Sequence, residues 1–147
     1  MTATAHALIG GAIAASIPNP AISLPLIALS HPIADMIPHW DFGFNWRQKP
    51  KMTLFAQCCA DLGVGLILSY LLFGRNLDFW YFLFAVTLSE AWDIIQVPYW
   101  FFDWKFPPFS TFYNVSHQIN SKAQLPWGVL TQAATVGGLV FALRFIH

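Results

Sequence analysis

A short segment in the first third of the sequence carries four side chains that can bind metal ions. It covers eleven residues at the end of an apolar stretch and contains His31, Asp35, His39 and Asp41. The whole chain of 147 residues has only seven acidic residues and five histidines. Polar groups are costly to bury without a partner, so we expect this cluster to bind a ligand that offsets the cost.

The spacing within the segment suits ligands to a single metal ion. His31 and Asp35 are four residues apart, which places them on one face of a helix. Two ligands at this spacing hold the zinc ion in helical zinc sites. We expect Pro38 to end the helix, because proline lacks the backbone N–H that a helix needs. His39 and Asp41 can then turn back toward the site as further ligands, although Asp41 could instead cap a loop.

Further ionisable side chains lie within or beside apolar segments and are candidates for the same site: His6, Asp61, Glu90, Asp93 and His117. The apolar segments with acidic candidates contain no lysine or arginine. Clustered carboxylates repel one another unless they share protons or a metal ion bridges them. Simpler roles stay open for some candidates. Glu90 or Asp93 could bond to a tryptophan or tyrosine, His6 could pack between helices, and His117 could face solvent.

The composition predicts an integral membrane protein of one domain, residues 1–147. Only 10% of the residues are charged, whereas 56% are hydrophobic and 17% are aromatic. Soluble domains have about 25% charged residues, so this chain has too few to form a polar shell. The formal net charge is zero and no basic stripe is present, which argues against a nucleic-acid partner.

Five apolar segments predict an all-α fold, a polytopic transmembrane bundle of about five helices. They cover residues 4–17, 21–37, 52–73, 77–102 and 125–146. The last three reach the ~20 residues that span a bilayer, whereas the first two are short and would form a tight hairpin. The first segment carries small residues at four-residue spacing, including Ala7 and Gly11, which let helices approach closely.

The distribution of basic residues predicts the orientation of this bundle. The two long loops hold five lysines and arginines, and the opposite side holds two, Arg75 and Arg144. Basic loops stay in the cytoplasm. We therefore expect the N-terminus and both long loops in the cytoplasm, in the inner membrane of a bacterium, with the candidate site facing that side.

Three motifs in the first 41 residues resemble the predicted membrane-bound metal-dependent hydrolases of bacteria. They are His6-x-x-x-Gly10, Ser30-His31-x-x-x-Asp35 and Pro38-His39-x-Asp41. That family is similar by motif to zinc-dependent phospholipase C. The resemblance implies a metal-dependent phosphoesterase or related hydrolase. It carries the family's His-x-x-x-Asp element onto His31 and Asp35, and its early histidine onto His6.

The leading hypothesis is therefore a hydrolase acting on a lipid-linked phosphoester at the cytoplasmic leaflet. One or two divalent cations would be held by metal ligands drawn from His6, His31, Asp35, Asp61 and Asp41. Zinc is favoured by the histidines, and manganese or magnesium by the carboxylates. Asp93 or Glu90 would act as general base or complete a second metal site, with His39 or His117 as the general acid.

Two other classes of function stay open. A small ion or proton transporter would use buried carboxylates and histidines as its pathway, but such a pathway distributes polar groups over the whole membrane depth. Here the candidates gather on one side. A non-catalytic membrane protein stabilised by a metal ion would hold that ion without an open coordination position.

Overall fold

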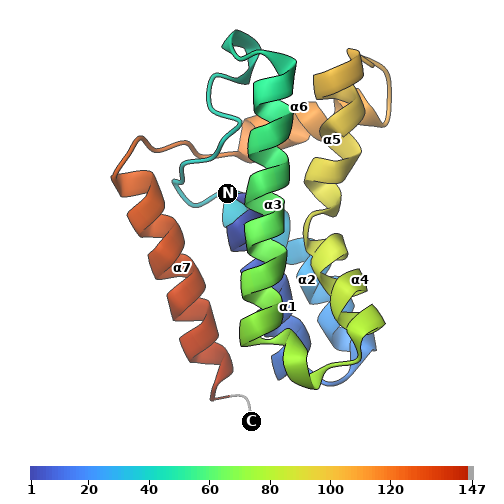
Figure 1. Cartoon of the computed structure of the whole chain (residues 1–147), viewed down its shortest axis with the longest axis vertical. Coiled ribbons are helices and arrows are strands. Elements are labelled where there is room, and N and C mark those ends of the chain that lie inside the picture. The colour runs from blue at the N-terminus through green and yellow to red at the C-terminus, as the bar shows by residue number, and fades with distance from the viewer. Residues whose placement is uncertain (146–147) are drawn as a thin grey trace.

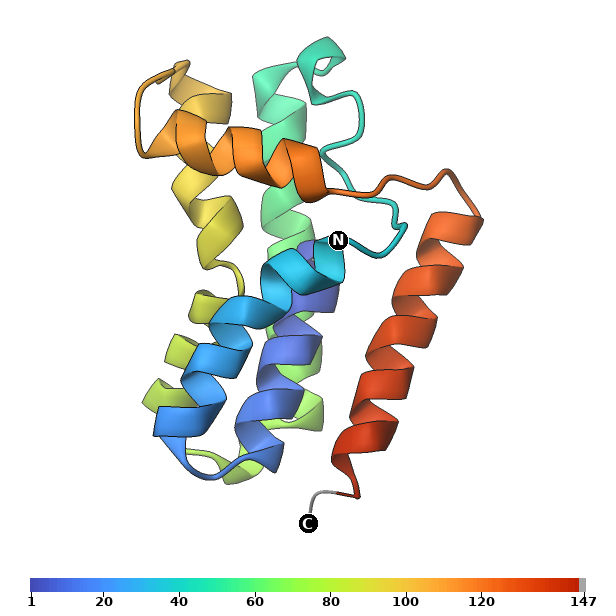
Figure 2. The same ribbon diagram turned by 180° about the vertical axis from the view of Figure 1, so that it is seen from behind.

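The computed structural model describes residues 1–145, and within this range the chain forms α-helices and no β-strand, so the predicted all-α class is confirmed (Figures 1 and 2). The α-helices are α1 (Ala3–Ser16), α2 (Pro20–Asp35), α3 (Lys51–Leu72), α4 (Phe79–Ser89), α5 (Ala91–Phe102), α6 (Phe109–Ile119) and α7 (Trp127–Leu143). Two short 3-10 turns, η1 (Trp46–Gln48) and η2 (Gly74–Asn76), flank α3.

The hairpin of α1 and α2 runs beside only one half of the long helix α3. The backbone N–H of Ala3, at the start of α1, donates to Asp61 Oδ2 at 2.7 Å, and Asp61 lies at the middle of α3. From there α1 runs toward the end of α3 and α2 returns, as both views show (Figures 1 and 2). The first two helices are short, as predicted. The start of α1 therefore meets α3 near its middle, and the end of α2 returns to the start of α1.

The predicted helix over residues 77–102 is wrong as one continuous element, because it breaks at Glu90 into α4 and α5. In an unbroken helix the carbonyl of Ser89 would accept from the N–H of Asp93. Here it accepts from His31 Nδ1 at 2.6 Å instead, and the N–H of Asp93 donates to the carbonyl of Glu90. A side chain that hydrogen-bonds to a helix carbonyl in place of the backbone N–H is a recognised cause of a kink.

A second difference from the prediction lies after α5. Residues 109–119, expected as a loop, form α6, which packs against α5 and lies at a steep angle to it (Figure 2). The break at Glu90 and this extra helix give seven α-helices in residues 1–145, where about five were expected. Lys51 and Asp103 join the start of α3 to the end of α5 through a 2.9 Å ion pair, which lowers the pKa of the exposed Asp103 carboxyl.

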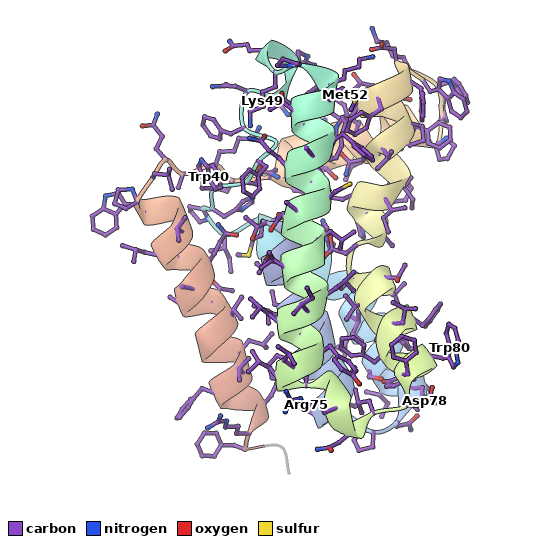
Figure 3. The ribbon with its side chains drawn as sticks, in the orientation of Figure 1. Trp40, Lys49, Met52, Arg75, Asp78 and Trp80 are labelled. Carbon is purple, nitrogen blue, oxygen red and sulfur yellow. The ribbon has the colours of Figure 1, made fainter. Side chains whose placement is uncertain are left out.

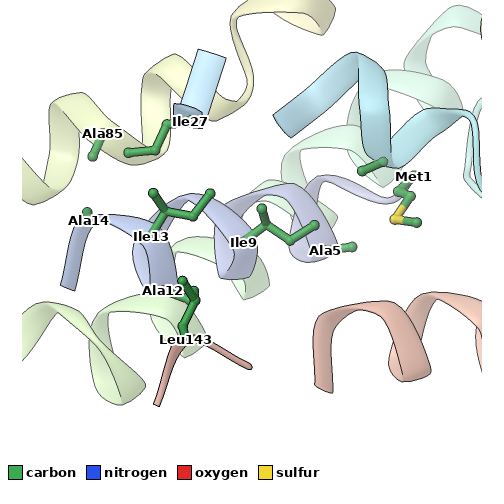
Figure 4. Packing of buried hydrophobic residues seen from close by; sticks show 10 residues of the cluster. Met1, Ala5, Ile9, Ala12, Ile13, Ala14, Ile27, Ala85 and Leu143 are labelled. Atoms are coloured by element: carbon green, nitrogen blue, oxygen red, sulfur yellow. The ribbon is translucent and has the colours of Figure 1, made fainter. Parts of the chain in front are cut away.

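Small residues let α1 pack at the centre of the bundle, as its four-residue pattern predicted. A Cβ added at Gly10 would lie 2.7 Å from Ser89 Cβ, and one added at Gly65 would lie 2.8 Å from Thr4 Cα. Both glycines therefore permit helix contacts that a side chain would block. Around α1 lies an apolar core, shown in Figure 4: Met1, Ala5, Ile9, Ala12, Ile13, Ala14, Ile27, Ala85 and Leu143.

The helix α3 is long and apolar enough to cross a membrane, and within residues 1–145 it alone passes that test. The helices α1, α4 and α7 are apolar but shorter. Several large apolar side chains of α3 point outward, such as Ile67 at 62% exposure. Charged side chains mark its two ends: Lys49 lies near one end, and Arg75 and Asp78 lie near the other (Figure 3).

Candidate metal centre

Two histidines and one aspartate from α1 and α2 meet in the interior. The side chains of His6, His31 and Asp35 are almost fully buried, with 1%, 1% and 4% exposure. His6 Nε2 lies 3.2 Å from Asp35 Oδ1, and His31 Nε2 lies 3.5 Å from Asp35 Oδ2. One donor atom from each residue falls within 4.8 Å of the others, so the group could hold a metal ion. The Met1 amine also contacts Asp35 Oδ1.

His31 is oriented by the break between α4 and α5. Its Nδ1 lies 2.6 Å from the carbonyl of Ser89, and because a carbonyl only accepts, Nδ1 carries the proton. The unprotonated Nε2 of the neutral ring then faces two carboxylates, Asp35 and Asp93, at 3.5 and 3.7 Å. A lone pair facing carboxylate oxygens requires a cation between them, either a proton or a metal ion. Histidine ligands are oriented in this way by a carbonyl on the other ring nitrogen.

His6 completes the group from α1. Its ring stacks on that of His31, with centroids 3.6 Å apart and an angle of 6° between the planes. Two stacked imidazoles repel each other when both are charged, so the stacking disfavours protonation of both rings, and the neutral ring is the form that binds metal ions. Buried donor atoms without a hydrogen-bond partner among the described residues include His6 Nδ1 and His31 Nε2. Two neutral imidazoles and one carboxylate fit a divalent ion such as zinc.

His39 and Asp41 lie directly beside this group. The chain turns after α2, and His39 Nε2 comes within 3.7 Å of Asp35 Oδ1 and 3.4 Å of Asp41 Oδ2. The turn is held by the connection between α6 and α7. The N–H of His39 donates to the carbonyl of Ser121 at 3.0 Å, and the N–H of Ala123 donates to the carbonyl of His39 at 2.8 Å.

Asp61 has a different set of partners from those expected of a metal ligand. Its carboxylate accepts from the N–H of Ala3 at 2.7 Å, from the N–H of Thr4 at 3.1 Å and from the Thr4 hydroxyl at 2.7 Å. It therefore caps the start of α1, where backbone N–H groups lack partners and a negative charge is favoured. Asp61 lies outside the group of His6, His31 and Asp35.

A cavity of about 430 Å³ adjoins the buried group and gathers the remaining candidates. Asp35, Asp41, Asp61, Glu90, Asp93 and His117 all line it. The side chain of Asp93 is 36% exposed, whereas Glu90 is buried and its Oε1 has no hydrogen-bond partner within the described chain. His117 lies on α6, and its ring stacks on Tyr113.

Basic side chains at the cavity were not recognised as site residues from the sequence. Arg47 and Lys122 line the same cavity as the carboxylates, and Arg47 Nη2 donates to the Tyr113 hydroxyl at 3.0 Å. From the sequence, Arg47 and Lys122 indicate only how the bundle is oriented in the membrane. The one local hint is the aromatic neighbourhood of Arg47, whose guanidinium lies 5.1 Å from the centre of the Trp46 ring.

The described chain thus holds a buried group of two histidines and one aspartate beside a cavity of mixed charge. Comparisons of the chain with models of protein families, with curated proteins and with solved structures find no match.

Proposed function

We propose that this protein is a membrane-embedded, metal-dependent hydrolase that cleaves a phosphoester bond in a lipid-linked substrate. The observation that carries the proposal is the buried group of His6, His31 and Asp35 at the edge of a cavity with acidic and basic walls. A purely structural metal site would need no such cavity. The proposal agrees with the resemblance of the first 41 residues to the membrane-bound metal-dependent hydrolases.

The metal ion would be held by His6, His31 and Asp35, and zinc suits two imidazoles and one carboxylate best. When bound, such an ion supplies a water molecule with a pKa near ~7 and polarises a phosphoryl oxygen. Ser89 contributes through its carbonyl, which fixes the ring of His31. Asp35 lines the cavity, so the ligand group and the space for a substrate share a wall.

Two side chains in the cavity wall suit the proton transfers of hydrolysis. Asp93 is partly exposed there and would accept the proton of the attacking water as its oxygen bonds to phosphorus. The ester P–O bond then breaks, and His117 would donate a proton to the departing oxygen. Glu90 is the alternative base. His39 is less suited to the acid role, since its free Nε2 faces Asp35 and Asp41 in the buried group.

The cavity wall supports a phosphate-bearing, apolar substrate. Arg47 and Lys122 supply positive charge for phosphate oxygens that do not bind the metal ion. Aromatic side chains, among them Trp46, Trp100 and Phe101, line the same space and suit a hydrocarbon chain. Together these features favour a lipid phosphoester over a small polar metabolite.

A membrane location is supported by α3 and by the outward-facing apolar side chains. We propose that α3, α7 and the pair α4–α5 cross the bilayer, and that the α1–α2 hairpin lies beside the half of α3 that follows Asp61. Arg47, Lys49 and Lys51 precede or begin α3 on the same side as the cavity, whereas Arg75 follows it at the far end. The positive-inside rule then puts the cavity at the cytoplasmic leaflet of a bacterial inner membrane.

The experiment is a phosphoesterase assay on the full chain, purified in detergent, loaded with zinc and mixed with phospholipid micelles. We expect phosphate-ester cleavage that falls at least ~100-fold in the Asp93→Asn variant, the loss typical for a general base. Asp78→Asn is the matched control, because Asp78 caps α4 at the opposite end of the bundle. No cleavage of any phospholipid or lipid phosphate by the metal-loaded protein contradicts the proposal, and full activity of Asp93→Asn contradicts the role of Asp93 as the base.

A further inference from the structure

We propose that His39 and Asp41, together with Asp35, form a second divalent-cation position, so that Asp35 bridges two metal ions. The inference rests on the proposed metal centre, because Asp35 belongs to both positions. Of the two roles that the sequence leaves open for His39, it assigns the ligand role and not the acid role.

Asp35 lies between two histidines that are arranged alike. His31 and His39 are four residues before and four residues after it. Each directs Nδ1 to a backbone carbonyl: His31 to that of Ser89 at 2.6 Å, and His39 to that of Ile37 at 2.7 Å. Each then presents Nε2 to Asp35, His31 to Oδ2 at 3.5 Å and His39 to Oδ1 at 3.7 Å. Oδ2 of the carboxylate thus faces His31, and Oδ1 faces His39 together with His6 and the Met1 amine.

His39 is held as rigidly as a ligand needs to be. Its side chain is fully buried, and its Nε2 has no hydrogen-bond partner among the described residues. Its backbone N–H and carbonyl are both paired with the segment that follows α6. With the proton on Nδ1, the neutral ring leaves only the Nε2 lone pair facing two carboxylates, so a cation is needed there.

Asp41 offers the second carboxylate of this position. Asp41 Oδ2 lies 3.4 Å from His39 Nε2, and Asp41 Oδ1 is buried without a hydrogen-bond partner in the described chain. Gly43 lies against this oxygen, because a Cβ at that position would come within 2.9 Å of Asp41 Oδ1. Asp41 therefore has a buried oxygen that a cation could use.

The local charge also favours a second cation. Asp35, Asp41, Asp93 and Glu90 all line the cavity. Among the ion pairs of the described residues, these carboxylates are paired only with histidines and the Met1 amine, and not with lysine or arginine. One divalent ion leaves much of this negative charge uncompensated. Two ions about 3.5–4 Å apart, bridged by a carboxylate, are the arrangement that many phosphoesterases use.

The test is the number of metal ions bound per chain, measured by elemental analysis of detergent-purified protein after loading with zinc and removal of free metal. We expect about two ions in the parent and about one in His39→Ala, as a bridged pair requires. Asp41→Asn keeps the size of the side chain and serves if His39→Ala fails to fold. His117→Ala is the matched control, a histidine outside both positions, and should keep the parent's metal content.

The outcomes separate this inference from the proposed function. If the parent binds one ion, the second position is overturned and the metal centre of His6, His31 and Asp35 stands. The same conclusion follows if both His39→Ala and Asp41→Asn still bind two ions. No stoichiometric ion in the parent overturns both. Loading with manganese adds a readout independent of activity: neighbouring ions couple magnetically, and the electron paramagnetic resonance spectrum should lose that coupling in His39→Ala. Two uncoupled ions in the parent also overturn the bridged pair.

Discussion

Asp61 provides a sharp test of the geometry, because the sequence favours a metal ligand and the structure shows a helix cap. We consider the change Asp61→Asn. The carboxylate receives the N–H groups of Ala3 and Thr4 on separate oxygens, at 2.7 and 3.1 Å. An asparagine keeps one acceptor oxygen and turns an NH₂ group toward the other N–H, so one hydrogen bond to a charged group is lost.

The size of the effect follows from these contacts. A hydrogen bond to a charged group contributes about 1.5–3 kcal/mol. The negative charge at the start of α1 adds about 0.3–1 kcal/mol through the helix dipole. We therefore expect Asp61→Asn to lower the free energy of unfolding by about 2–4 kcal/mol. Asp78→Asn is the control, because asparagine caps a helix about as well as aspartate and α4 should keep its cap.

The assay is reversible unfolding in mixed detergent micelles, followed by circular dichroism, with metal content measured on the same samples. Asp61→Asn should lose stability and keep its metal ions. The opposite pattern is a loss of metal with a free energy of unfolding within ~0.5 kcal/mol of the parent, the usual range of neutral surface changes. That result would exclude the helix-cap role of Asp61. That pattern would make Asp61 a ligand.

Three further predictions follow from the packing, the metal centre and the cavity. Gly65→Ala should be less stable than Gly63→Ala by about 1–3 kcal/mol in the same unfolding assay. A Cβ at Gly65 meets the Thr4 backbone, whereas one at Gly63 meets nothing within 4 Å. Equal stabilities of the two variants would contradict the close contact of α1 and α3. Removal of metal with a chelator should lower the free energy of unfolding by about 2.7 kcal/mol, relative to protein with free metal at 100 times Kd. Adding the metal again should restore the stability. Unchanged stability would contradict a bound ion. Arg47→Gln should raise KM for a lipid phosphoester about 10-fold, with a smaller change in kcat, since it removes a phosphate contact; a fall in kcat alone would exclude that role.

The meeting of α1 and α2 could be predicted in part from the sequence. His31 and Asp35 share a helix face by their spacing, and a hairpin of two short helices brings His6 to the same region. Small residues such as Gly10 indicated that α1 packs closely, and that prediction is confirmed. These features depend on local periodicity and on a short connection, which a sequence displays directly.

The break of the fourth apolar segment could not be predicted, because its cause lies far away in sequence. Glu90 is preceded by neither glycine nor proline, and the helix ends there as His31 takes the carbonyl of Ser89. The partners of Asp61 are equally remote, since they lie at the start of α1. Such contacts between distant segments leave no pattern in either segment alone.

The central claim is that the buried histidines and aspartate bind metal, and the metal content of the purified chain tests it most directly. The protein should be prepared in detergent under metal-replete conditions beside a variant carrying both His31→Ala and Asp35→Ala. We expect at least one divalent ion per chain in the parent and none in the variant. A parent without stoichiometric metal, or a variant that binds as much as the parent, would contradict it.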